Sequence, residues 1–404
     1  PEGNHASGHH DGASMRRVTG AGLAACLFGV LCLASCSDPV SKTGVPTGPD
    51  RITFHADDNP DTLSAWGLFT LEDGQIEPDE RMVTYELNAP LFSDYAQKWR
   101  TIYVPEGESG TYDARDAFEF PIGTIITKTF YYPLPEAAED RHGDQVLKPT
   151  DATYQTGING LDMQGIRLIE TRLLVRRADG WDALPYVWNA DQSEAVLRRA
   201  GADLSLTMVS EGESTAFNYS VPNVNQCAGC HATDYNDRAI KPIGVRARHL
   251  NRDFDGAGGE MNQLRRLADI GYIDGLPALK SVPKNADWDD ASLPIAARAR
   301  SYLDINCSHC HSDVGPARTS GLWLMADVTE LRQWGICKPP VAAGRGTGDR
   351  GFDIMPGEPH QSILTYRMES LDPGEMMPEI GRSLMHEEGV ALISDWISGM
   401  TETC

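Results

Sequence analysis

The sequence lacks the features that assign a chain to several common classes of protein. Lys and Arg are scarce, 35 against 58 Asp and Glu, and the net charge of −23 argues against nucleic acid or an anionic membrane surface as a partner. Cysteine, at 9 of 404 residues, is too rare for a small disulfide scaffold. The apolar run Ala21–Leu33 is too short to span a bilayer. No Gly-Lys-Ser/Thr accompanies the G-x-G-x-x-G match at Gly346–Gly351, which we interpret as a loop.

What the sequence does contain is one short motif in two copies. Both Cys227-Ala-Gly-Cys230-His231 and Cys307-Ser-His-Cys310-His311 read C-x-x-C-H. Two thiols at this spacing can each form a thioether with a haem vinyl group, and the next histidine then lies beneath the iron. A zinc ribbon does not need the adjacent histidine, and a dithiol redox motif gives no reason for a second copy. The motifs predict two covalently attached haem c groups, bound through Cys227, Cys230, Cys307 and Cys310, with His231 and His311 as proximal iron ligands.

The second axial ligand of each iron sets its potential and reactivity. For the second haem we favour Met377, because Met377-Pro378 follows a polar loop and precedes the last predicted helix. Met376 and Met355 are weaker candidates, and the alternative is that all three methionines fill gaps in a core. His309 lies between the two cysteines of its motif and cannot easily turn to the iron, so we expect it at the rim of the site.

The first unit does not repeat this arrangement. At the position equivalent to Met377-Pro378 the sequence has Leu276-Pro277, and leucine cannot bind iron. Either His249 or Met261 supplies the ligand, or the first iron is five-coordinate.

Two of the remaining cysteines, Cys337 and Cys404, belong to neither motif. A secreted compartment would allow them to form a disulfide, and the alternative is two buried free thiols. Cys36 belongs to a different feature. It ends Leu33-Ala-Ser-Cys36, which resembles a bacterial lipobox and predicts a lipid on Cys36, while the following Ser37 favours the outer membrane; ordinary signal cleavage is the alternative.

The N-terminal region divides by composition into three segments. Met15-Arg-Arg followed by the apolar run has the layout of a secretory signal, and a stretch rich in Ser, Thr, Gly and Pro follows it. We therefore expect an upstream or non-native segment at 1–14, a lipoprotein signal peptide at 15–36 and a tether at 37–50.

The stretch 51–220 has mostly strand-like patterns. In Asp116–Tyr132 apolar residues recur at period two, among them Phe118, Ile122 and Phe130. Ile169–Val175 repeats this alternation, with Glu170 and Arg172 on the opposite face. The pattern predicts an antiparallel β-sandwich-like domain.

After residue 220 the pattern changes to helix and loop. Helical spacing predicts helices over Glu260–Ile270, Ser292–Asn306 and from Glu387 onward. The predicted fold is multidomain α+β, with the β-rich domain followed by two tandem, mostly α-helical cytochrome c-like units at 221–290 and 291–404.

With these motifs placed, the chain resembles a family of bacterial di-haem c-type cytochromes, conserved hypothetical lipoproteins with a β-rich N-terminal domain. The resemblance extends from about Arg51 to the C-terminus and implies two covalent haems but no established substrate. The matching stretches are Leu87–Ala96, Phe120–Thr124, Glu170–Leu174, Tyr186–Asn189, Asn225–His231, Pro242–Gly244, Asn306–His311 and Met377-Pro378.

Three functions are compatible with these features. The first is a lipid-anchored protein of the cell envelope that faces the periplasm and passes single electrons to a redox protein partner, for which the acidic composition suits a basic docking patch. The second is a di-haem peroxidase-like or other haem oxidoreductase that uses an open first haem. The third makes the β-rich domain a sensor or docking module with the haems as reporters.

Overall fold

The computed structural model describes residues 52–135, 143–256, 259–341 and 343–404. The predicted lipidation site at Cys36, the signal peptide and the tether lie outside the described residues. The fold is mixed α+β with mainly antiparallel sheets, as the sequence predicted at that level. The described residues all belong to one compact unit, and the boundaries predicted near 220 and 290 stay predictions.

The central element is a six-stranded sheet in which every neighbouring pair is antiparallel. Its strands, in spatial order, are β11 (Ala195–Leu197), β10 (Gly180–Trp188), β9 (Ile166–Arg177), β6 (Ile125–Pro133), β4 (Gln97–Tyr103) and β3 (Val83–Thr84). The predicted strand Ile169–Val175 lies in β9, and the second half of Asp116–Tyr132 forms β6. The predicted alternation is wrong at Ile169, because a register shift between Phe130 and Tyr131 puts it in the cluster of Phe130 and not in that of Leu173.

The first half of that run was predicted wrongly as continuous strand. Ile122, expected to point inward with Phe118, is 51% exposed. The chain turns here, because Thr124 N–H donates to the Pro121 carbonyl and Gly123 adopts a φ of 94° that side chains disfavour. The turn interrupts the period-two pattern, so Phe118 is buried from a loop.

Smaller sheets surround the central one. The strands of these sheets are β1 (Phe69–Glu72), β2 (Gln75–Pro78) and β8 (Leu161–Asp162); β7 (Gln145–Leu147), β12 (Ala202–Ser210) and β13 (Glu213–Val221); β14 (Asp253–Gly256) and β15 (Gly259–Asn262); and β5 (Gly110–Thr111) and β16 (Ile273–Asp274). The pairs β7–β12 and β5–β16 are parallel.

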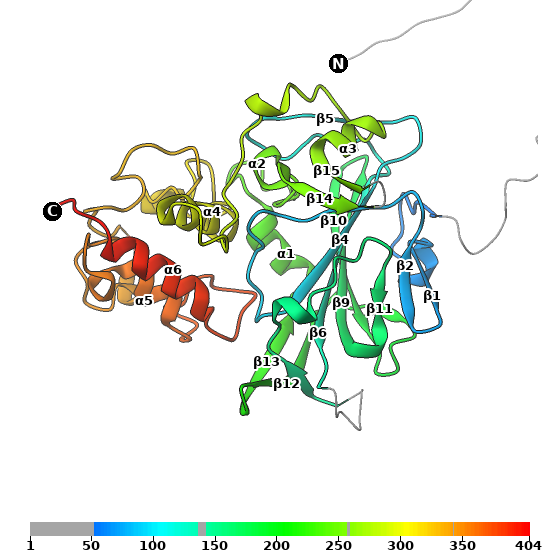
Figure 1. Ribbon diagram of the computed structural model, residues 1–404, viewed down its shortest axis with the longest axis horizontal. Helices are drawn as coiled ribbons and strands as arrows, with labels where there is room; N and C mark the ends of the chain where they lie inside the picture. Colours follow the sequence, from blue (N-terminus) through cyan, green and yellow to red (C-terminus); the bar gives the residue numbers. More distant parts are fainter. Residues whose placement is uncertain (1–51, 136–142, 257–258, 342) are drawn as a thin grey trace, which may run out of the picture. The chain divides into compact units, whose positions relative to one another are not determined.

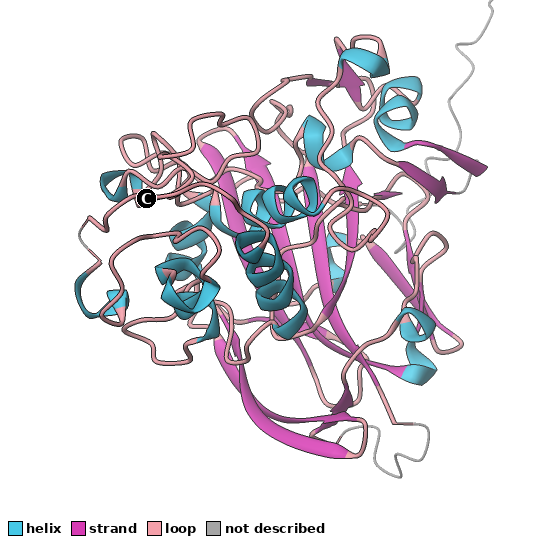
Figure 2. Cartoon of the chain, turned by 60° about the vertical axis from the view of Figure 1, so that its left-hand side comes forward, coloured by secondary structure: helices cyan, strands magenta, loops and turns pink. Residues whose placement is uncertain are grey.

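Six α-helices lie in the described residues, and Figure 2 shows several of them in front of the long strands. They are α1 (Val224–His231), α2 (Ala247–Leu250), α3 (Gln263–Asp269), α4 (Ile295–Cys307), α5 (Ile363–Glu369) and α6 (Glu387–Ser398). Short 3-10 turns occupy Ser64–Trp66, Asp151–Thr153, Met163–Gly165, Leu279–Ser281, Arg318–Ser320, Gly344–Thr347 and Pro359–Gln361. Among the described residues, no helix combines the length and apolar character that crossing a membrane requires.

The helix predicted over Glu260–Ile270 starts three residues late. Glu260 and Met261 belong to β15, where Met261 pairs with Phe254 across a hairpin. Asn262 then caps α3 by accepting a hydrogen bond from Leu264 N–H. Capping and hairpin pairing override the helical spacing at this end.

The two faces of the central sheet differ. One face packs against the sheet of β1, β2 and β8 around Trp66, Trp99 and Tyr131. The other face is apolar at both ends: α2 and α3 cover one end around Ile126, and β12 and β13 cover the other around Phe130. In Figure 1, α1 lies between these two ends.

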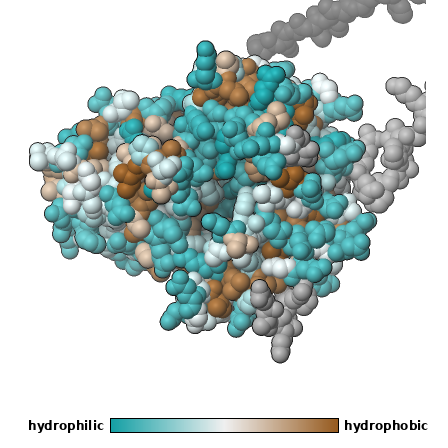
Figure 3. Space-filling model, viewed as in Figure 1, coloured by the Kyte–Doolittle hydropathy of each residue, from teal (hydrophilic) through white to brown (hydrophobic). Residues whose placement is uncertain are grey.

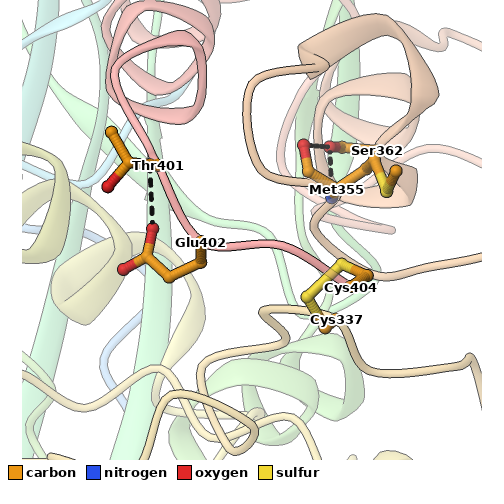
Figure 4. The surroundings of a disulfide bond; sticks show 6 residues. All are labelled: Cys337, Met355, Ser362, Thr401, Glu402 and Cys404. Carbon is orange, nitrogen blue, oxygen red and sulfur yellow. Dashed lines mark hydrogen bonds between the residues drawn. A yellow bond between two sulfur atoms is a disulfide. The ribbon is translucent and has the colours of Figure 1, made fainter.

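The C-terminal residues have their own apolar core. Helix α6 contacts both α4 and α5, and Leu303, Trp334 and Ile393 are among its buried side chains. A disulfide joins Cys337 to Cys404, the pair that neither motif uses (Figure 4), and so ties the C-terminus to the loop before α5.

Candidate functional site

Both C-x-x-C-H motifs contribute to one cavity of about 780 Å³, a volume within the range of sites that enclose small molecules and cofactors. Cys307, Cys310 and His311 of the second motif line it. From the first motif, Gly229 and Cys230 line it as well. The two motifs were predicted to belong to separate units, whereas both contribute residues to this one cavity.

The second motif is positioned by the end of α4. That helix ends at Cys307, and the N–H groups of Cys310 and His311 both donate to the Cys307 carbonyl, at 3.1 and 2.9 Å. Gly315 packs against this turn so closely that a Cβ there would collide with the Cys310 carbonyl. The two thiols and the imidazole are thus presented on one tight turn.

The first motif lies entirely within α1. Asn223 caps the helix by accepting hydrogen bonds from Asn225 and Gln226 N–H, and the Gln226 side chain closes a capping box. The ring of His231 is oriented by a 2.8 Å hydrogen bond between its Nδ1 and the Lys241 carbonyl. Such a bond fixes the tautomer and leaves Nε2 for an iron atom.

The histidines that end the two motifs are kept neutral, the form that can bind a metal. Burial lowers the pKa of His231 to about 3, with Lys128 as the next cause, and lowers that of His311 to about 4, with Arg367 next. Neutral imidazole is the ligating species, so burial favours ligation at both positions.

The four motif cysteines are not tuned for dithiol chemistry. Burial raises the pKa of Cys227 and Cys230, and raises that of Cys307 and Cys310 to about 12. Reactive C-x-x-C pairs have thiol pKa values lowered below the free value. This contrast disfavours the dithiol redox alternative.

Of the three methionines proposed for the second haem, only Met377 is among the residues that line the cavity. Its N–H donates to the Arg367 carbonyl at 2.8 Å, which attaches the methionine loop to α5. Met368 on α5 also lines the cavity, and the sequence analysis did not consider it. Its position within the helical stripe of α5, with Ile363 and Leu364, is the signal that could have identified it.

Two arginines bring positive charge to the cavity. Arg367 and Arg382 line it. The Nη2 group of Arg382 donates to the carbonyls of Arg367 and Ser370, and its buried Nε has no hydrogen-bond partner among the described residues. His309, which we had expected at the rim, also lines the cavity and is only 4% exposed. Guanidinium groups suit carboxylates, so these residues fit a haem with carboxylate side chains.

The two motifs touch each other directly. The Sγ atom of Cys310 lies 3.6 Å from the Gly229 carbonyl oxygen. Next to this contact, Tyr235 N–H donates to the Val314 carbonyl at 2.8 Å, and the guanidinium of Arg318 lies 3.6 Å from the centre of the Tyr235 ring. The loops that follow the two motifs are thus packed together.

His249 has other partners. Its Nε2 lies 3.3 Å from Oδ2 of Asp304, and its Nδ1 lies 3.4 Å from Nδ2 of Asn285. Asp304 also accepts two hydrogen bonds from Arg248, at 2.6 and 3.0 Å. Both ring nitrogens of His249 therefore face protein groups in a buried ion-pair cluster.

The other residues proposed around the first iron are also placed by the structure. Met261 lies on β15, and Leu276 packs against the apolar end of the central sheet that α2 and α3 cover. Neither residue is among those that line the cavity.

Within the described ranges, no group of three or more His, Cys, Asp or Glu side chains is arranged to hold a bare metal ion. Each motif instead presents one imidazole and two thiols, the protein groups by which haem c is held. No protein-family model, no curated protein and no solved structure matches the chain.

Proposed function

We propose that the chain is a di-haem c-type cytochrome that transfers single electrons in the bacterial cell envelope. One observation carries this proposal: Met377 faces the same cavity as Cys307, Cys310 and His311. A methionine opposite a C-x-x-C-H histidine completes a six-coordinate iron of the electron-transfer type. The resemblance to the di-haem lipoprotein family agrees with this function.

Different residues of the chain would attach each haem, ligate its iron and pair with its carboxylates. Thioethers from Cys227 and Cys230, and from Cys307 and Cys310, would attach the two macrocycles. His231 and His311 would be the proximal ligands, kept neutral by burial. A bound haem c supplies an iron that alternates between two oxidation states. Arg367 and Arg382 would receive carboxylates of the second haem.

Two tandem cytochrome c-like units belong to the same proposal. The second is supported by α4, α5 and α6, which share one core with the second motif at its edge. The first would consist of α1, α2 and α3 built onto the central sheet. The contact between Cys310 and Gly229 supports electron exchange between the units, because it joins their attachment sites.

The proposed location and partner rest on features of the sequence. A lipid on Cys36 would anchor the protein in the outer membrane, with the folded part facing the periplasm. The redox partner would be a protein with a basic docking patch, since the chain has a net charge of −23. Figure 3 shows hydrophilic residues over most of the face in view.

A second candidate, a haem oxidoreductase with an open first iron, is favoured by one observation. His249 is engaged by Asp304 and Asn285, and Leu276 occupies the position equivalent to Met377. The spin state of the oxidised protein separates the two functions. Two low-spin irons contradict the oxidoreductase, and a high-spin iron with hydrogen peroxide turnover contradicts the pure carrier.

The test of the main proposal is a haem count after denaturation of the full chain. We expect two covalently retained haems in the wild type and one in each of the double variants Cys227→Ser/Cys230→Ser and Cys307→Ser/Cys310→Ser. The control Cys337→Ser/Cys404→Ser removes two cysteines outside the motifs and should retain two. Fewer than two haems in the wild type would refute the proposal.

A further inference from the structure

Three cations lie in register across the middle of the central sheet. Arg100 on β4 pairs with Lys128 on β6, and Lys128 pairs with Arg172 on β9. Residues paired directly across antiparallel strands point to the same face, so these side chains form one row. Like charges in such positions destabilise a sheet unless something neutralises them.

The row lies on the face that is apolar at both ends. On one side the next residues in register are Ile102, Ile126 and Leu174, and on the other they are Lys98, Phe130 and Glu170. Phe130 is fully buried, and the cationic groups of Lys98, Lys128 and Arg172 lie 5.6, 5.1 and 4.4 Å from its ring centre. Four cations thus gather where the packing of the sheet alone would favour apolar side chains.

Carboxylates account for only two of these charges. Glu170 accepts two hydrogen bonds from Arg172 and one from the Tyr219 hydroxyl, and Glu86 lies 3.5 Å from Arg100. The ammonium of Lys98 donates to the Ala96 carbonyl.

Lys128 is the one cation of the four for which the described residues provide no polar partner. Among the described residues its ammonium group has no hydrogen bond or ion pair, and the half-buried side chain has only a cation–π contact with the Phe130 ring. Burial, and then Arg172 and Arg100, lower the pKa of Lys128 to about 7. A cation in this position is costly without an anion beside it.

The row adjoins the first motif. Helix α1, which carries that motif, contacts β10, the strand next to β9. In Figure 1, α1 lies between the end of the sheet that α2 and α3 cover and the end that β12 and β13 cover, which is where the row lies. An anion at the row would therefore lie next to the first C-x-x-C-H sequence.

We propose that the row of Arg100, Lys128 and Arg172 binds a carboxylate or another small oxyanion beside the first motif. Lys128 offers an unpaired ammonium, and Arg172 and Arg100, already held by Glu170 and Glu86, add positive charge on either side of it. This arrangement suits one carboxylate or another small oxyanion at Lys128. The anion has two possible sources: a carboxylate carried by the first haem, which rests on the proposed function, or a diffusible anion that reaches the site beside it.

The test compares Lys128→Gln with Lys280→Gln, which removes the same charge from an exposed position, in the full chain purified with its haem. Three quantities are measured: covalent haem per chain, the midpoint potential of each haem without added anion, and binding of sulfate and of acetate by calorimetry. Lys128→Arg keeps the charge and should match the wild type. Arg100→Gln serves as the neutral variant if Lys128→Gln does not fold.

The two possible sources of the anion predict different results in this test. With a haem-borne carboxylate, Lys128→Gln lowers the potential of one haem, because a positive charge no longer stabilises the reduced iron, and neither probe binds at the row. With a diffusible anion, sulfate or acetate binds the wild type and Lys280→Gln at one site, and Lys128→Gln weakens that binding at least tenfold.

The inference is overturned if Lys128→Gln and Lys280→Gln have the same midpoint potentials and bind sulfate and acetate equally. If the wild type proves to contain no covalent haem, the proposed function fails, and calorimetry on the haem-free chain still tests the row. Binding that Lys128→Gln abolishes then supports the site, and absence of binding refutes it.

Discussion

The same five-residue pattern stands in two different settings in this molecule. The first copy forms one helix, α1, beside the cationic middle of a sheet. The second follows the end of α4, in a helical region that also supplies Met377. The pattern specifies attachment, whereas the residues that would tune each iron come from elements far away in the chain. Two haems held by identical motifs are therefore expected to differ in potential.

The largest effect on this contrast is expected from Met377→Ala. Loss of the thioether ligand should convert one of the two irons from low spin to high spin and lower its potential, because methionine ligation raises the potential. Electronic absorption and redox titration measure both changes. Met368→Ala is the matched control, since Met368 lines the same cavity from α5. Equal spectra for the two variants would remove Met377 as the ligand.

A smaller effect, on stability, is expected from Asp304→Asn. Asp304 lies on α4 three residues before the second motif, and its partners Arg248 and His249 lie on α2. Removing its charge leaves Arg248 buried without a counter-charge, which should lower the free energy of unfolding by about 3 to 5 kcal/mol. Urea unfolding measures the loss.

The matched control for that prediction is Asp327→Asn. Asp327 pairs with Arg115 at 3.3 Å, but both side chains are more than half exposed. The expected loss is below about 1 kcal/mol. If the two variants lose the same stability, the buried cluster does not hold α4 and α2 together.

The smallest effect concerns pH. Burial raises the pKa of Asp94 to about 6, although the N–H groups of Ser383 and Leu384 donate to its carboxylate. The folded state then keeps a proton that the unfolded state releases near pH 4. Asp94 therefore reduces stability progressively as pH rises from about 4 to 6, by up to ~3 kcal/mol, and the reduction is complete above this range.

Asp94→Asn should remove this part of the pH dependence, which unfolding measured at pH 4.5 and pH 7 will show. The exposed Asp57→Asn should keep the wild-type difference between the two pH values. A wild-type difference retained by Asp94→Asn would mean that other groups cause it. Because Asp94 joins the strand region to the loop after Met377, the measurement also reports on how firmly that loop is held.

The parts of the fold that follow local rules could be predicted from the sequence. Alternation identified β9 and the second half of Asp116–Tyr132, and helical spacing identified α4 and α6. Local competition caused the errors: a turn at Gly123 exposed Ile122, and a hairpin took Glu260 and Met261 from the helix.

The candidate site also contains residues that the sequence could predict and residues that it could not. The motif residues and Met377 could be read from spacing, because C-x-x-C-H and Met-Pro are local patterns. The buried cluster around Asp304 and the cation row could not, since each joins residues from separate elements. Glu170 and Arg172 were assigned to the face opposite Leu173, but nothing in the sequence shows that Tyr219 buries Glu170 there.

The contact between Cys310 and Gly229 has a consequence for how such a protein is made. The two proposed attachment sites share one cavity, and three of their thiols, those of Cys230, Cys307 and Cys310, are only partly buried there. Cys227 is buried. If haem is attached as proposed, the bond to Cys227 would have to form before α1 is fully packed, whereas the second motif could receive its haem in the folded chain.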